Sequence, residues 1–507
     1  MARFPAPRQP KPGSRPVVNL AGGQAFDRDP RVALASYVLT SMVQDTFYQS
    51  ADEQIETVRG LVRNLAVKGD LLFAAKAAVH ARHEGGLRSI SHVVAGEVAQ
   101  LRGEFPDQRG SWGPTFFTRV VHRLDDMSEI AGYWIGTYAK GKDKKTLPNA
   151  MKRGFGRVFA NAKPGLLAKW DGETTRSLTL RQLAHLCHPK GGKDSTVYKL
   201  RAGTLVAADT HEVAMTRAGQ VEGGTEAVAT AKAEAWGDLF RRGKVQYLAA
   251  LRNARNIIEQ APDQVDALVQ KLLSLDDIRG SKVLPFQFLP AYAAVTELSG
   301  PHARKVLGAI ENAAELALSN VPKFEGATLV CLDDSGSMHT NRKAEGNPWH
   351  KRPAIVGSMF VVALARTLED CDVMRFSEDA HYVTLPAGVG LFDGITRLTA
   401  RPCNHGTNFH APFQAANRKY DRIILLSDAQ GWMAAGQPGA SLRDYEKRYE
   451  AKPQLYSWDL VGSSTSQFPA PRQFALAGIS DRAFDLMGAL EQDPNAMVAR
   501  INALSFE

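Results

Sequence analysis

The spacing of apolar residues changes once along this chain of 507 residues, and the change divides it into two kinds of domain. From Asp29 to about Asn320, apolar residues recur every three or four positions, which is the spacing of amphipathic helices. Beyond residue 322 they gather into short runs that alternate with helical stretches. Such alternation predicts a mostly parallel sheet covered by helices on both faces. The sequence therefore predicts an all-α domain followed by an α/β domain.

The helical part repeats in pattern but not in residues. Its predicted helices begin every ~20 residues, so that two helices occupy about 40 residues, the size of a HEAT-type unit. Stacked units of this kind form an α-solenoid. The predicted helices cover residues 32–48, 53–66, 71–83, 90–101, 112–124, 130–138, 147–159, 178–187, 197–205, 226–240, 245–258, 264–275, 286–298 and 303–318.

The second part begins with a glycine and proline-containing junction at residues 321–326. Five short apolar runs after it predict strands, and three amphipathic stretches predict helices between them. The strands are expected at residues 329–332, 373–376, 381–385, 423–426 and 455–461, and the helices at 354–368, 411–419 and 442–449. This order is typical of a Rossmann-like α/β domain, which we place at residues 322–507.

A motif of the form D-x-S-x-S stands at the end of the first of these strands. Asp333, Ser335 and Ser337 follow the apolar run directly. A loop of this kind gathers one carboxylate and two hydroxyls around a single point, which is the chemistry that a hard divalent cation requires. The alternative is an ordinary Ser/Gly turn after a strand.

Two further residues fit the same site, since Thr407 follows a glycine and Asp428 ends a second apolar run. Together, Asp333, Ser335, Ser337, Thr407 and Asp428 resemble the metal-ion-dependent adhesion site (MIDAS) of von Willebrand factor A (vWA) domains. The resemblance implies a divalent metal ion, with Mg²⁺ favoured over Mn²⁺, and an acidic ligand that completes its coordination. If there is no metal site, Asp428 is simply a solvated loop residue.

The net charge of +9 is unevenly distributed along the chain. Residues 325–507 carry 18 basic and 21 acidic side chains, whereas residues 140–201 alone carry 15 basic and 4 acidic ones. A basic block of this size is the electrostatic footprint of a partner that is a polyanion, and nucleic acid is the leading candidate. The alternative is a set of solvated helix faces.

Other features of the composition limit the class of protein. Residues 1–21 are basic and proline-rich without an apolar core, so we expect a basic flexible tail and not a secretory signal. No run of about 18 apolar residues predicts a membrane span. The four cysteines form no CxxC pair and are expected to be reduced thiols, which favours a cytoplasmic protein.

A long helical domain followed by a vWA-type domain is similar to the TROVE-domain family, which includes the Ro autoantigen and its bacterial homologues. Family-like segments include Asp27-Arg28-Asp29-Pro30, Leu251 to Ile257 and Leu183 to Pro189. The resemblance implies that residues 22–321 form a ring of helical repeats whose ends the vWA domain joins. It also implies that single-stranded ends of misfolded RNA enter the hole and that Y RNA binds the outer surface.

Several basic residues match this expectation of RNA binding. Lys152, Arg153 and Arg157 fall at helical spacing and predict a cationic stripe. A Lys, an Arg and a helix-end His contact RNA in the family, and by position Lys169, Arg176 and His188 match them best, with Arg181 nearby.

Three other sets of residues in the helical domain could also bind a ligand, but for each of them a structural role or a plain surface location is favoured. Trp134, Tyr138 and Trp170 could stack unpaired bases, although burial between helices is the favoured alternative. Zinc at His185, Cys187 and His188 is disfavoured because no fourth ligand lies nearby. A cluster of His80, Arg82 and His83 at a helix end could bind phosphate, but a plain surface location is favoured.

The sequence favours a monomeric, non-catalytic RNA-binding ring protein that acts in the quality control of non-coding RNA or presents RNA to an exoribonuclease. No set of nucleophile, base and orienting residue suggests an enzyme. The first alternative is a vWA adaptor whose solenoid binds proteins. The second is a metal-dependent nuclease that uses Asp333 and Asp428, which the lack of a general base disfavours.

Overall fold

The structure is a computed structural model of the chain. It describes residues 16–18, 24–26, 29–40, 51–139, 146–171, 178–206, 210–340, 348–403, 406–428, 438–460, 468, 473–477, 482–493 and 496–506. Within this part of the chain, no helix is both long and apolar enough to cross a membrane.

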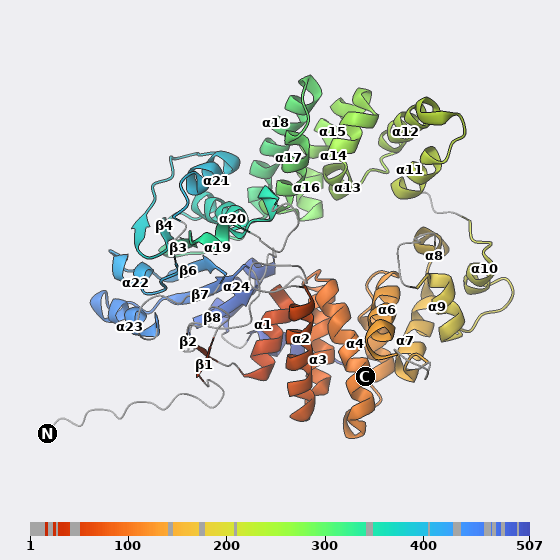
Figure 1. Cartoon of the computed structure of the whole chain (residues 1–507), viewed down its shortest axis with the longest axis horizontal. Coiled ribbons are helices and arrows are strands. Elements are labelled where there is room, and N and C mark those ends of the chain that lie inside the picture. The colour runs from red at the N-terminus through yellow and green to blue at the C-terminus, as the bar shows by residue number, and fades with distance from the viewer. Residues whose placement is uncertain are drawn as a thin grey trace.

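The first half of the helical domain is a succession of helices in which each packs against near neighbours in the sequence (Figure 1). Contacts between α2 and α4, α5 and α7, and α7 and α9 show the stacking expected of a solenoid. These helices are α1 (Pro30–Thr40), α2 (Ala51–Val67), α3 (Leu71–His83), α4 (Ser89–Glu104), η1 (Pro106–Gln108), α5 (Gly113–Arg119), α6 (Asp126–Tyr138), α7 (Asn149–Asn161), α8 (Pro164–Asp171), α9 (Leu180–Cys187) and α10 (Thr196–Ala202).

The second half of the helical domain continues around the same arc. Its helices are α11 (His211–Gly219), α12 (Gly224–Arg241), α13 (Tyr247–Arg252), α14 (Ala254–Gln260), η2 (Pro262–Gln264), α15 (Val265–Leu272), α16 (Leu275–Ser281), η3 (Pro285–Phe288), α17 (Leu289–Thr296), α18 (Pro301–Leu316) and η4 (Ala317–Asn320).

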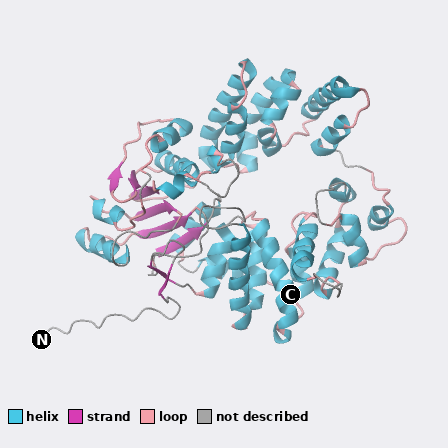
Figure 2. Cartoon of the chain, in the orientation of Figure 1, coloured by secondary structure: helices cyan, strands magenta, loops and turns pink. Residues whose placement is uncertain are grey.

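The α/β domain follows the last of these helices, and its strands form a six-stranded sheet in the part of the chain described (Figure 2). The order is β5-β4-β3-β6-β7-β8, with every pair parallel except β4 and β5. The elements are β3 (Thr328–Asp333), α19 (Gly336–His339), η5 (Trp349–Lys351), α20 (Pro353–Thr367), β4 (Cys371–Phe376), β5 (Ala380–Tyr382), α21 (Leu391–Thr399), α22 (Ala411–Ala415), β6 (Arg422–Ser427), α23 (Pro438–Arg448), β7 (Gln454–Asp459), β8 (Gln473–Ala477), α24 (Arg482–Gln492) and α25 (Ala496–Asn502).

The two faces of this sheet belong to different hydrophobic cores. Alternate residues of a strand point to opposite faces. Val330 and Leu332 of β3 lie in the same core cluster as the buried residues of the helical domain. Leu329 and Cys331 belong to a separate cluster with residues of α22 and α23. One face of the α/β domain is therefore continuous with the helical core, and the two domains pack as one body.

The α/β domain lies between the two ends of the helical arc, so that the chain closes into a ring (Figure 1). At one end, α1 contacts β8, α24 and α25. At the other end, α18 contacts α21, and η3 contacts α20. Near the C-terminus, the ring of Phe506 stacks on Trp112 and lies 6.0 Å from Phe116, so these last residues also pack against the helical domain.

These observations confirm the predicted fold class, an all-α domain followed by an α/β domain. Several elements were not predicted, among them α8, α11, α21 and the edge strand β8. The strand predicted at residues 381–385 is the shorter β5, and it runs antiparallel to β4. Pro16–Val18, which we assigned to the basic tail, instead form β1 and pair with β2 (Gln24–Phe26), because β-branched valines favour extended backbone.

Candidate functional site

Helix α7 carries the predicted cationic stripe, but its members face two directions. Arg153 and Arg157 are exposed and, being four residues apart, share one face of the helix. Lys152 is half-buried on the side of α9, where its charge lies close enough to Cys187 to lower the thiol pKa. Burial outweighs that effect and raises the pKa of Cys187 to about 12. The stripe therefore divides into an outward pair and an inward lysine.

Helix α9 contacts both α7 and α8, and it presents the next predicted residues. It begins with a capping box, in which the Thr179 hydroxyl accepts from the Gln182 amide at 3.2 Å and the Gln182 side chain accepts from the Thr179 amide. Arg181 is exposed in its first turn. His188 is exposed at its C-terminal cap, in the left-handed region with φ of 46°.

The left-handed backbone of His188 is unfavourable for a residue with a side chain, and glycine normally occupies this position of a helix cap. Strain of this kind concentrates at functional sites.

For two other predicted RNA-binding residues the structure gives less. Lys169 lies in α8, where its backbone is described but its side chain is not, and Arg176 lies outside the described residues.

Sequence reasoning missed two arginines that lie close to the outward pair of α7. Arg102 near the end of α4 and Arg109 after η1 line the same pocket as Arg153 and Arg157. Nothing in the sequence marks them, because an arginine near a helix end is most often a solvated residue. Only the packing of α4 and α5 against α7 brings the four guanidinium groups together.

For the cluster at the end of α3 we favoured a plain surface location over phosphate binding, and the surface location is wrong for Arg82. Arg82 is buried and donates to both carboxylate oxygens of Asp126, at 3.0 and 3.2 Å. His83 instead contacts the carbonyl of Arg119 through its ring nitrogen at 2.5 Å. Arg82 is thus consumed by an internal ion pair, which leaves no cluster for phosphate.

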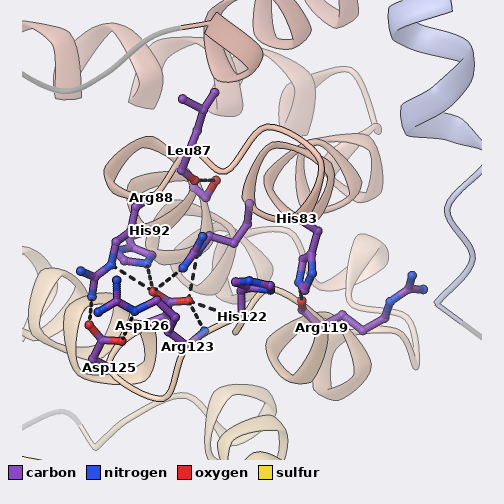
Figure 3. Close-up of polar contacts among 11 residues, drawn as sticks. His83, Leu87, Arg88, His92, Arg119, His122, Arg123, Asp125 and Asp126 are labelled. Atoms are coloured by element: carbon purple, nitrogen blue, oxygen red, sulfur yellow. Dashed lines mark hydrogen bonds and ion pairs between the residues drawn. The ribbon is translucent and has the colours of Figure 1, made fainter. Parts of the chain in front are cut away.

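Asp126 is the centre of this buried network (Figure 3). Besides Arg82, its oxygens accept from the side chains of Arg88 and His92, at 3.1 and 3.0 Å, and from the backbone amides of His122 and Arg123. Burial raises the pKa of this carboxyl, but hydrogen bonds and charge from His92 and Arg82 outweigh it and hold the pKa well below its ordinary value. The network ties α3, α4 and α6 together and has a structural role.

The second predicted site lies at the carboxyl edge of the sheet. Asp333 ends β3 and is fully buried. Its oxygens accept from the Ser335 amide at 2.9 Å and from the Ser427 hydroxyl at 2.5 Å. Burial raises the pKa of Asp333 to about 6, although these hydrogen bonds act in the opposite direction. Among the described residues no cationic side chain forms an ion pair with Asp333, so its charge has no internal counterpart.

The other predicted ligands come to the same edge by two different routes. The hydroxyl of Ser337 lies 3.2 Å from that of Ser335. Thr407 is buried, and its neighbours are fixed to Ser377 at the end of β4, which donates to the carbonyl of Gly406 and accepts from the amide of Asn408. In the register of the sheet, Asp333 pairs with Phe376, which places Thr407 beside β3.

Asp428 is buried directly after β6, the strand that flanks β3 on its other side. Ser427, which sequence reasoning missed, precedes it and bonds Asp333. Asp334 turns away from this group and is held by the Arg375 side chain, by His339 at 2.6 Å and by the Cys403 amide at 3.0 Å. The Asp333 carboxylate, which forms no ion pair among the described residues, together with the neighbouring carboxylate and hydroxyl oxygens makes a donor set that fits a hard cation such as Mg²⁺.

The described residues support neither zinc binding at His185, Cys187 and His188 nor base stacking by Trp134, Tyr138 and Trp170. Cys187 is buried while His185 and His188 are exposed, and within the described part of the chain no three His, Cys, Asp or Glu side chains are placed to hold a metal. The candidate cation site at the edge of the sheet is of a different kind, because it combines two carboxylates, Asp333 and Asp428, with hydroxyl groups. Trp134 is buried, Tyr138 donates to Glu97 at 2.6 Å, and Trp170 lies under Arg123.

Comparisons with known proteins agree with this geometry. The family model of the Ro60 vWA domain matches residues 327–487, and that of the TROVE domain matches residues 225–349. The RNA-binding protein RO60 of Deinococcus radiodurans is 22% identical, over 97% of this chain and 96% of its own length. The crystal structure of the RO (RSR) protein of Deinococcus radiodurans has a TM-score of 0.60 at 17% identity, covering 93% of this chain and 99% of that one.

The structural likeness extends over both domains, and the matched families occur in the order in which the two domains are folded here. The chain therefore contains a region that matches the TROVE domain, followed by a region that matches the vWA domain of Ro60.

Proposed function

We propose that this protein binds RNA through the cationic surface of α7, α8 and α9. The observation that carries the proposal is the placement of the basic block: 15 of the 19 charged side chains in residues 140–201 are basic, and the described part of this segment folds into adjacent helices. Lys152, Arg153, Arg157, Lys169, Arg176, Arg181 and His188 are the proposed contacts. A relative that is an RNA-binding protein supports the same conclusion.

The proposed ligands are Y-like RNA and misfolded or single-stranded non-coding RNA, and the proposed role is RNA quality control or the presentation of RNA to an exoribonuclease. Arginine and lysine contacts to phosphate give affinity without sequence preference, as a scavenger of diverse RNA requires. The chain would not itself be an enzyme. Four free cysteines support a reducing compartment such as the cytoplasm.

We further propose that the carboxyl edge of the sheet binds a divalent cation, with Mg²⁺ favoured. Asp333, Ser335, Ser337, Thr407 and Asp428 would hold the ion, and the ion would supply an open coordination position for a carboxylate of a protein partner. The support is the buried Asp333 carboxylate, whose charge no described side chain neutralises. Such a site is binding chemistry and needs no general base.

The salt dependence of binding to a single-stranded oligoribonucleotide tests the RNA proposal. Each phosphate that a side chain neutralises contributes about 0.7 to the slope of log K against log salt. Arg153→Gln with Arg157→Gln should therefore reduce the slope by ~1.4 if each arginine contacts one phosphate. The matched control is Arg241→Gln with Arg242→Gln on α12, which removes the same charge elsewhere. A flat salt response of the unmodified protein would reject the proposal.

Two further measurements separate the alternatives. Co-purifying nucleic acid, visible as a high ratio of absorbance at 260 to 280 nm, distinguishes an RNA-binding protein from a protein adaptor. Degradation of single-stranded RNA by the pure protein, abolished by Asp333→Ala, would instead identify a metal-dependent nuclease.

A further inference from the structure

A pocket with a volume of about 750 Å³ opens where α4, α5, α6 and α7 meet. Its charged lining consists of Arg102, Arg109, Arg153 and Arg157, and among the described residues that line it there is no Asp or Glu. The nearest acidic residues of α4 are committed elsewhere: Glu97 accepts from tyrosines of α6, and Glu104 pairs with Arg63. Four guanidinium groups thus share one pocket without a carboxylate.

Arg102 is the least ordinary of the four, because it is only 9% exposed. Its guanidinium lies 4.2 Å from the centre of the Trp112 ring, and its Nη2 donates to the carbonyl of Gly110 at 3.3 Å. A Cβ on Gly113 would stand 2.5 Å from Nη2, so glycine at this position leaves room for the guanidinium. The side chain is therefore held by its contact with the Trp112 ring and by one hydrogen bond to the backbone, without an ion pair among the described residues.

One nitrogen of the buried guanidinium has no hydrogen-bond partner among the described residues. That nitrogen is Nη1, and the same holds within the described part of the chain for the indole Nε1 of Trp134, a residue that lines the same pocket and is 4% exposed. A buried donor without an acceptor costs about 1–3 kcal/mol, and more when it is charged. A small rotation of the guanidinium toward the pocket would bring Nη1 to any anion bound there.

Electrostatics points in the same direction. Burial, together with the positive charge of Arg109, lowers the pKa of Arg102 to about 10. The start of α7, at Asn149 and Ala150, also lines the pocket and adds backbone amides and the positive end of a helix dipole. The clustered positive charges and the helix dipole repel one another in an empty pocket, whereas each of them attracts an anion that enters.

We infer that this pocket binds a phosphomonoester, and specifically the terminal phosphate of an RNA strand. A terminal phosphate carries close to two negative charges at neutral pH, whereas a phosphate within a strand carries one, and guanidinium groups bind either through paired hydrogen bonds. Pro114, which is partly exposed, lies beside the arginines in the lining and offers an apolar surface to the terminal nucleoside. The inference rests on the proposed RNA binding and specifies which part of the RNA this surface recognises.

The test measures binding of one single-stranded decaribonucleotide that carries a 5′-phosphate, a 3′-phosphate or hydroxyls at both ends, at fixed salt. We expect a phosphorylated form to bind about tenfold tighter than the hydroxyl form. Arg102→Gln should remove most of that preference while the hydroxyl form binds as before. Arg241→Gln on α12 should leave the preference intact.

Two additional variants protect the test against misfolding. Arg109→Gln changes an exposed residue and should weaken the preference. Because Arg109 also donates to the carbonyls of Arg102 and Gly103, a melting curve of this variant is measured beside its binding. Trp134→Phe keeps the ring but removes the indole N–H, and should weaken the preference as well.

Free adenosine monophosphate, with adenosine as its control, distinguishes the possible sources of the phosphate. Equal binding of all three oligonucleotides, without binding of the monophosphate, overturns the inference. Binding of the monophosphate that depends on Arg102, without discrimination between RNA ends, assigns the pocket to a free nucleotide and overturns the assignment to RNA. If no oligonucleotide binds at all, the proposed function fails, and the monophosphate alone then decides whether the pocket takes a phosphomonoester.

Discussion

Asp126 in the helical domain and Asp333 in the vWA domain are both fully buried carboxylates, but their surroundings differ in charge. Asp126 accepts hydrogen bonds from two arginines and a histidine. The donors to Asp333 among the described residues are uncharged, namely the side chain of Ser427 and the side chain and backbone amide of Ser335. The pKa of Asp126 is accordingly lowered, whereas that of Asp333 is raised to about 6.

This difference separates structural charges from charges that serve a ligand. A buried ion that is neutralised within the fold stabilises the arrangement of the helices around it, and removing one partner is strongly destabilising. A buried ion that is not neutralised costs free energy until a ligand of opposite charge arrives. Arg102 belongs with Asp333 in this respect, as a buried cation without a carboxylate.

The largest effect is expected from removing the charge of Asp126. Asp126→Asn should lower the free energy of unfolding by ~3–5 kcal/mol at pH 7, because it leaves the buried Arg82 without its counter-ion and removes one of the two carboxylates that Arg88 contacts. Urea unfolding measures the change. Asp107→Asn, at an exposed carboxylate of η1, is the control and should have almost no effect. A loss below ~1 kcal/mol would remove the distinction between the two buried aspartates.

Asp333 should behave in the opposite way. In the presence of a chelator, Asp333→Asn should be at least as stable as the unmodified protein at pH 7, because it removes an uncompensated buried charge. Magnesium at about 100 times its Kd should stabilise the unmodified protein by ~2.7 kcal/mol and leave the variant unchanged.

Differential scanning calorimetry with and without Mg²⁺ measures this stabilisation, and Asp393→Asn, an exposed residue of α21, serves as the control. Stabilisation of the Asp333→Asn protein by Mg²⁺ would show that the ion binds elsewhere. RNA affinity should change less than about twofold in this variant, since the altered group lies on the acidic domain and not on the basic helices.

The pH dependence of stability gives a finer comparison. The pKa of Asp126 is lowered in the folded state from its ordinary value of 3.8, so its stabilisation is complete above that value and is lost as the pH falls below it. The difference in unfolding free energy between the unmodified protein and Asp126→Asn should therefore be constant from pH 7 to about 5 and shrink below pH 4. A difference that shrank already near pH 6 would contradict the assignment of this stabilisation to the Asp126 carboxylate.

The smallest effect is expected at His188, whose left-handed backbone glycine would adopt more easily. His188→Gly should change the free energy of unfolding by less than ~1 kcal/mol, since relief of strain offsets the greater freedom of the unfolded chain. The melting temperature should therefore be unchanged or slightly higher. If the imidazole contacts RNA, affinity for a hairpin-containing RNA should nevertheless fall several-fold. A stable variant with unchanged affinity would exclude His188 from the site.

Much of the fold could be predicted because helix and strand periodicity is encoded within short segments. The pattern around Leu71 to His83 predicted α3 to the residue, and the apolar run at 423–426 predicted most of β6. The metal motif was visible for the same reason, since Asp333, Ser335 and Ser337 are neighbours in the chain. Edge elements such as β8 were not predicted, because their apolar patterns are weak and these strands depend on packing against other elements for their stability.

The sequence by itself determined the succession of helices and strands, the domain boundary region, the concentration of positive charge in residues 140–201 and the hydroxyl-rich loop after β3. Tertiary structure alone decided which charges are neutralised. Arg82 and Arg102 both lie near the ends of helices and carry the same group, yet one meets Asp126 from 44 positions away and the other meets no carboxylate among the described residues. Electrostatic energy depends on distance in space and on burial, and neither follows from distance along the chain.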